Sequence, residues 1–144
     1  MSYTPPDPPV MPYLMVHDGP GALDWYGRAF GAEVKVRYDM EDGRLGHAMI
    51  GINGGDLYLA DEFPEAVETV GALTPRTLGG TTVTISLAVD DVDAWLGRAV
   101  GQGAEVIRPA IDEFYGRHAK LRDPYGHVWS LLGPRLRGDD KGAG

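Results

Sequence analysis

The sequence contains no cysteine, and this absence removes several classes of site at once. Disulfide bonds, thiolate zinc sites, iron–sulfur clusters and cysteine nucleophiles all require that side chain. A cysteine-free chain whose first residues show no signal-peptide pattern leads us to expect a cytoplasmic protein. The sequence also lacks an apolar run of the roughly 18 residues that a membrane helix needs, so we expect no membrane partner.

Positive charge is scarce as well. Lys and Arg number 13 against 21 Asp and Glu, which gives a formal net charge of −8. Because binding to nucleic-acid phosphates needs clustered Lys and Arg, we expect no nucleic-acid partner. Apolar residues make up 43% of the 144 positions, which is enough for one packed domain.

What the sequence does contain is an internal repeat at an offset of 70–73 residues. Such a repeat is typical of a chain built from two copies of one structural unit. The matching words are Trp25-x-Gly27-Arg28-Ala29 with Trp95-x-Gly97-Arg98-Ala99, Ala32-Glu33-Val34 with Ala104-Glu105-Val106, His47-Ala48 with His118-Ala119, and Gly55 with Gly126.

Each half is predicted to run strand, helix, strand, strand, strand. Residues 82–89 alternate between large apolar and small side chains, which is the period of a strand. Val92, Trp95, Leu96 and Ala99 share one helical face. The prediction is an α+β fold of two βαβββ modules. Its parts are a flexible proline-rich arm (1–9), the first module (10–61), a linker (62–80), the second module (81–133) and a disordered tail (134–144).

Two such modules, together with the words at 25–32, 89–94, 114–117 and 123–130, resemble the vicinal oxygen chelate superfamily. That superfamily includes glyoxalase I, bleomycin-resistance proteins and extradiol dioxygenases, and the chain is similar to its PhnB-like bacterial branch over about residues 10 to 133. The resemblance implies a curled mixed sheet around a ligand cleft. It also implies a homodimer and, for some members, a role in antibiotic resistance.

In metal-using relatives, four strand positions supply His, Glu or Asp ligands. The resemblance places these positions at Met11, Leu59, Thr84 and Ser130, none of which carries such a side chain. No metal site and no cofactor are therefore predicted. A divalent metal held by other residues, such as His47, His118 and Asp61, stays open as an alternative.

Strand alternation then predicts which side chains line the cleft. The large residue Trp129 is assigned to the core, and the turn at 123–126 to structure alone. The expected ligand contacts are Met11, Tyr13, Met49, Leu59, Thr84, Ser86, Tyr115, Arg117, His118 and Ser130.

The favoured function is the binding of a small, planar or aromatic polar molecule in a metal-free cleft. One alternative is a glyoxalase-like lyase or isomerase, or a dioxygenase-type enzyme, that uses a metal or His118 as acid and base, with Lys120 or Tyr115 as its partner. Another alternative is a non-catalytic interaction module.

Overall fold

The computed structural model describes residue 5 and residues 8–136, and within them two modules of one topology follow each other. The first module comprises β1 (Tyr13–Val16), α1 (Gly19–Phe30), β2 (Glu33–Asp39), β3 (Leu45–Ile52) and β4 (Gly55–Asp61). The second comprises β5 (Thr84–Ala88), α4 (Val92–Gly101), β6 (Glu105–Glu113), β7 (Gly116–Arg122) and β8 (Val128–Gly133). The predicted α+β fold is confirmed. Residues 1–4, 6–7 and 137–144, where most of the predicted arm and tail fall, lie outside the described residues.

Each module forms its own four-stranded mixed sheet. The strand orders are β1-β4-β3-β2 and β5-β8-β7-β6, with the first pair of each sheet parallel and the others antiparallel. A helix connects the first strand of each sheet to its far edge strand and covers one face of that sheet. Among the described residues, no helix has the length and apolar character needed to cross a membrane.

Both long helices begin at an aspartate. The Asp18 carboxylate accepts from the backbone N–H of Gly21 at the start of α1, and Asp91 accepts from that of Ala94 at the start of α4. These bonds satisfy N–H groups that have no partner within the first helical turn. The helix α1 ends at Gly31, which has a φ of 66° that glycine adopts without strain.

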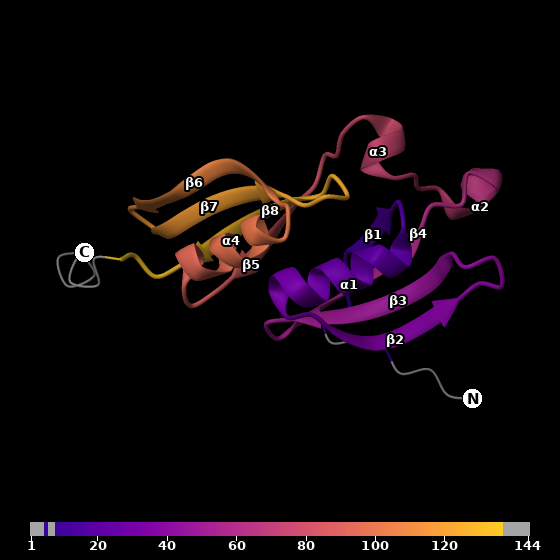
Figure 1. Cartoon of the computed structure of the whole chain (residues 1–144), viewed down its shortest axis with the longest axis horizontal. Helices are drawn as coiled ribbons and strands as arrows, with labels where there is room; N and C mark the ends of the chain where they lie inside the picture. The colour runs from indigo at the N-terminus through magenta and orange to yellow at the C-terminus, as the bar shows by residue number, and fades with distance from the viewer. Residues whose placement is uncertain (1–4, 6–7, 137–144) are drawn as a thin grey trace.

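The linker between the modules is folded rather than extended. It contains the short helices η1 (Pro64–Ala66), α2 (Val67–Val70) and α3 (Pro75–Leu78). The Glu62 carboxylate accepts from the backbone N–H and hydroxyl of Thr74 and from the Thr77 hydroxyl. These bonds tie the start of the linker to α3, beside the edge of the first sheet (Figure 1).

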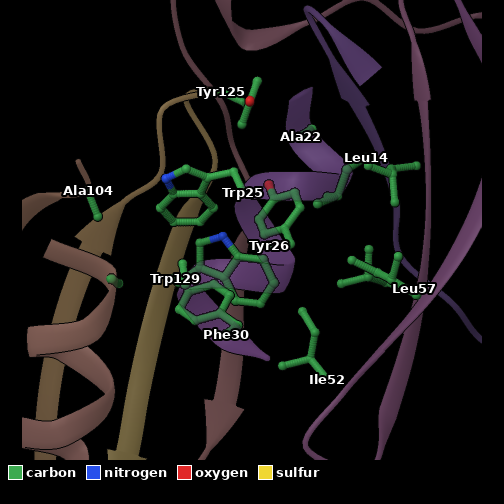
Figure 2. Packing of buried hydrophobic residues seen from close by; sticks show 14 of the residues in the cluster. Leu14, Ala22, Trp25, Tyr26, Phe30, Ile52, Leu57, Ala104, Tyr125 and Trp129 are labelled. Atoms are coloured by element: carbon green, nitrogen blue, oxygen red, sulfur yellow. The ribbon is translucent and has the colours of Figure 1, made fainter. Parts of the chain in front are cut away.

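The two modules share one hydrophobic core, which lies on the helix side of both sheets. The helices α1 and α4 lie next to each other in Figure 1. In Figure 2 the rings of Trp25, Tyr26 and Phe30 from α1 gather around Trp129 of β8. The ring centroids of Phe30 and Trp129 are 4.8 Å apart, and those of Tyr26 and Trp129 are 5.8 Å apart. Trp129 is therefore a core residue, as predicted.

A buried carboxylate holds this junction in place. Asp123, in the turn between β7 and β8, accepts from the Tyr26 hydroxyl at 2.5 Å and from Trp129 Nε1 at 2.9 Å. Its second oxygen accepts from the backbone N–H groups of Tyr125 and His127. A buried charge is tolerated only when its hydrogen-bonding capacity is used, and here four donors use it. Because Tyr26 belongs to the first module and Asp123 to the second, this contact fixes one module against the other.

The shared core determines where the uncovered sheet faces lie. Since the helix-covered faces of both sheets meet in one core, the opposite face of each sheet turns away from it, toward the outside of the chain. A single chain therefore does not close a cleft between its two open faces. "Open face" below means the face of a sheet that carries no helix.

We predict that Tyr26→Phe lowers the free energy of unfolding by about 1.5–3 kcal/mol, because it leaves Asp123 one donor short in a buried position. The measurement is urea unfolding. The matched control is Tyr38→Phe, which removes the hydroxyl of a tyrosine that is 66% exposed and should change stability by less than about 0.5 kcal/mol. Equal effects of the two substitutions would contradict the role assigned to Asp123.

Candidate functional site

The open face of the second sheet carries a row of polar and cationic side chains. Strand pairing sets Ser86 beside Ser130, Ser130 beside Lys120, and Lys120 beside Arg108, so that the row crosses all four strands from β5 to β6. The neighbours of these residues along β7 and β8, Ala119, Leu121, Trp129 and Leu131, are buried on the helix side. Thr84 precedes Ser86 on the same face of β5, as predicted.

His118 connects this row to the loop between β6 and β7. Its Nε2 lies 2.6 Å from the Ser130 hydroxyl oxygen. Its Nδ1 lies 3.2 Å from Arg108 Nη1 and 3.2 Å from the Tyr115 hydroxyl. The second terminal nitrogen of Arg108 donates to Glu113. The structure thus brings together three predicted site residues, His118, Ser130 and Tyr115, and adds Arg108, which was not predicted.

The hydrogen bonds assign the tautomer of His118. A guanidinium only donates, so the Nδ1 that Arg108 contacts must present a lone pair. The neutral ring then carries its hydrogen on Nε2 and donates it to Ser130. Partial burial, followed by the charges of Arg108 and Lys120, lowers the pKa of His118 and favours this neutral form.

The open face of the first sheet is aromatic instead. At the equivalent places, strand pairing sets Tyr13 beside Tyr58, Tyr58 beside Met49, and Met49 beside Val36. The ring of Tyr58 lies 5.4 Å from that of Tyr13 and 5.1 Å from that of His47. His47 is the counterpart of His118, and its Nδ1 lies 2.7 Å from the Tyr13 hydroxyl.

Two hollows adjoin this aromatic face where the linker passes the edge strand β1. One has a volume of about 480 Å³ and reaches Leu73, Leu78 and His127, and the other has a volume of about 380 Å³ and reaches Phe63 and Val70. Both are lined by Tyr13 and Met15 of β1. The volumes of these hollows fall within the range that is usual for small-molecule sites.

The expected cleft position of Leu59 is wrong. Leu59 is fully buried on the helix side of β4, and Tyr58 takes the open-face place that is equivalent to Ser130. The turn Pro124–Gly126 in the second module has one residue more than Asn53–Gly54 in the first, so the true offset after it is 72. The glycines with a φ of 90° in the two turns are Gly54 and Gly126, not the matched pair of the sequence prediction.

The expected cleft position of Arg117 is also wrong. Arg117 lies on the helix side of β7 and donates two hydrogen bonds to Asp93 of α4 and one to Asp112 of β6. These ion pairs raise the pKa of Arg117 and lower that of Asp93. Met11 precedes β1 and is half-buried. Lys120 and Met49 lie on the open faces.

Tyr58 and Arg108 are the site residues that sequence reasoning missed. An aromatic residue between two leucines of the strand was the available signal for Tyr58. Arg108 lies in β6, where its pairing to β7 shifts register on both sides, so simple alternation did not place it.

The residues at the metal-ligand positions of the family do not fit a metal. With Tyr58 in place of Leu59, the set is Met11, Tyr58, Thr84 and Ser130, which offers no imidazole or carboxylate. Asp61 is committed elsewhere, since its oxygens accept from the backbone N–H groups of Gly19 and Leu45. Within the described part of the chain, no three His, Asp or Glu side chains are grouped as metal ligands.

The sequence matches a known protein family over most of its length. Residues 9–131 match the model of the Glyoxalase/Bleomycin resistance protein/Dioxygenase superfamily. Uncharacterised proteins of Mycobacterium tuberculosis and Mycobacterium bovis are 42% identical over 129 residues, which cover 89% of this chain and 75% and 84% of theirs.

Solved structures share the fold over most of its length. TioX from Micromonospora sp. ML1 is 26% identical, with a TM-score of 0.66 over 88% of this chain and 96% of that one. A PhnB protein from Bacillus cereus is 18% identical, with a TM-score of 0.63 over 85% and 97% of the two chains. A variant of the fosfomycin resistance protein FosX from Listeria monocytogenes, complexed with Mn(II) and a dihydroxypropylphosphonic acid, is 18% identical, with a TM-score of 0.64 over 88% and 91%.

We predict that part of the stability of this fold is lost in acid through His118. Because the folded state lowers the pKa of His118, the unfolded chain binds the proton more tightly. The loss should begin as the pH falls through about 6.5, the ordinary pKa of histidine, and end below the lowered pKa of the folded state.

His118→Gln, which keeps a donor toward Ser130 but cannot be protonated, should remove this component from urea-unfolding curves measured between pH 7.5 and 5. The control is His47→Gln, in which His118 is retained and the component should persist. An unchanged acid dependence in His118→Gln would contradict the assignment.

Proposed function

Because the chain belongs to the glyoxalase/bleomycin resistance protein/dioxygenase superfamily, we propose that it binds a small, planar polar molecule between two open sheet faces. The observation that carries the proposal is the pair of equivalent rows on these faces. The first row, Tyr13–Tyr58–Met49–Val36, offers rings and apolar surface. The second, Ser86–Ser130–Lys120–Arg108, offers hydrogen-bond donors and positive charge. A few polar groups beside an apolar surface are the usual composition of a small-molecule site.

A second copy of the chain would complete the site. The two open faces of one chain turn away from their shared core, so they cannot enclose a ligand together. In a twofold-symmetric homodimer, the first sheet of each copy meets the second sheet of the other, which creates two identical sites. The exposed ring of Tyr13 on the first sheet would then be covered by the partner.

Sequestration or transport of the bound compound needs no catalytic group, which suits a site whose metal-ligand positions hold Met11, Tyr58, Thr84 and Ser130. Shape and ring stacking would supply most of the affinity, and the polar row would orient the ligand.

One observation favours a second candidate, a lyase or isomerase of the glyoxalase type. His118 is a neutral, half-buried imidazole within 3.2 Å of the Tyr115 hydroxyl, an arrangement that allows proton transfer to a bound ligand. Under this candidate His118→Ala abolishes turnover while the ligand still binds. Under the first candidate no turnover exists to be lost.

We predict a solution mass of twice the chain mass of 15.5 kDa by light scattering, and ligand sites that form only between copies. The test uses Met49→Glu and Lys120→Glu, which place a carboxylate at equivalent points of the first and second sheets. Binding is measured with any planar polar compound that raises the melting temperature of the wild-type protein. Each variant alone should lose binding, because both of its sites carry the new charge.

The two variants refolded together should regain about a quarter of the wild-type sites, since half the dimers are mixed and each mixed dimer holds one unaltered site. The control is each variant refolded with itself. A mixture that binds no better than its components, or a monomeric protein, would contradict the shared site.

A further inference from the structure

The hydrogen bonding of Ser130 indicates the chemical class of the ligand. The hydroxyl of Ser130 receives the Nε2–H of His118 at 2.6 Å. One lone pair of the hydroxyl is therefore engaged, while its own hydrogen has no acceptor among the described side chains. Its hydrogen is free to point out of the sheet, toward whatever lies over the open face. Ser130 thus presents a donor to the open face, and an acceptor atom of the ligand would satisfy it.

The charges around Ser130 also favour an acceptor group on the ligand. Lys120 is the direct cross-strand neighbour of Ser130 and Arg108 is the next residue in the row. Glu113 binds Arg108, but Lys120 has no carboxylate partner within the part of the chain that the structure describes. An unpaired lysine on this face stands out in a chain whose net charge is −8. It favours an acceptor that carries negative charge.

The equivalent row of the first sheet contains no charged group. Tyr13, Tyr58 and His47 form a surface of adjoining rings whose centroids are 5.1–5.5 Å apart. The Tyr13 hydroxyl is engaged with His47 Nδ1, which leaves the ring faces as the main contact surface. Such a surface suits a flat ring system.

From these contacts we propose that the ligand is a planar aromatic acid or acidic phenol, with its anionic oxygen group at Ser130 and Lys120 and its rings on Tyr13 and Tyr58 of the partner copy. His118 acts as a positioning residue, because it orients the Ser130 hydroxyl. The inference rests on the proposed function and adds to it the charge of the ligand and its direction in the site.

The test compares three probes with one ring system by calorimetry or fluorescence titration: 1-hydroxy-2-naphthoate, its neutral amide, and 2-naphthylmethylammonium. The naphthoate should bind at least about tenfold more tightly than the amide, and the ammonium least. Ser130→Ala and Lys120→Met should each reduce the preference for the acid over the amide about fivefold or more. Lys120→Met installs the residue that the first sheet has at the same place, Met49.

The control is Arg37→Met, which removes one positive charge from β2, where Arg37 pairs with Asp39 away from the row, and should leave the preference unchanged. Equal or tighter binding of the amide or the ammonium would overturn the ligand class and leave the proposed function standing. If none of the three probes binds, both the proposed site and its ligand class fail.

A readout without ligand tests the positioning role. The imidazole ¹⁵N shifts of His118 in the free protein should report a neutral ring with hydrogen on Nε2. A neutral ring with hydrogen on Nδ1 would turn the Ser130 hydroxyl toward His118 and overturn the inference. In His118→Ala the preference for the acid should fall, and in His118→Gln, which keeps the donor, much of it should return.

Discussion

The buried carboxylate of Asp123 is the contact on which the arrangement of this molecule depends. It binds the Tyr26 hydroxyl of the first module and the indole of Trp129 in the second, and so holds the aromatic core between them in one geometry. Burial and the nearby carboxylate raise the pKa of Tyr26 well above its usual value, so the hydroxyl stays protonated and donates at neutral pH. With the helix sides joined in this way, each sheet has only one face left for a ligand, and that face points outward.

This constraint explains why the open faces of the two modules could diverge more freely than their helix sides. The helix sides meet, and a change in volume there disturbs a packed core. The open faces do not contact each other within the chain, so their rows can change independently. One histidine remains at the same place in both, yet His47 lies among tyrosine rings while His118 lies among Arg108, Tyr115 and Ser130. Two copies of one framework thus present an aromatic surface and a donor surface.

The sequence was sufficient for the fold because its signals were local and repeated. The alternation around Ile85 predicts a strand, and the spacing of Trp95 and Ala99 predicts a helix. The internal repeat supports both predictions, because the same elements are expected in the other half. The side chains of the site were harder to predict, because a shift of one residue moves a side chain to the other face. Because the turn at Pro124–Gly126 has one added residue, the place equivalent to Ser130 is held by Tyr58 and not by Leu59. The register shifts of β6 made the face of Arg108 unpredictable from alternation. Arg117 was misplaced for another reason: a charged side chain on the helix side is expected only once its partners, Asp93 and Asp112, are seen beside it.

The exchange of Leu59 for Tyr58 on the open face changes the functional interpretation most. With Leu59 on the open face, the two open faces would have differed only in how apolar they are. With Tyr58 there, the place equivalent to Ser130 holds a ring whose neighbours are Tyr13 and His47. Stacking and charge-assisted hydrogen bonding differ in their dependence on the ligand, since any flat ring satisfies the first and only an acceptor satisfies the second. A site divided in this way can tolerate variation in the ring system while discriminating strongly at its polar end, and that division is built into the two rows before any ligand arrives.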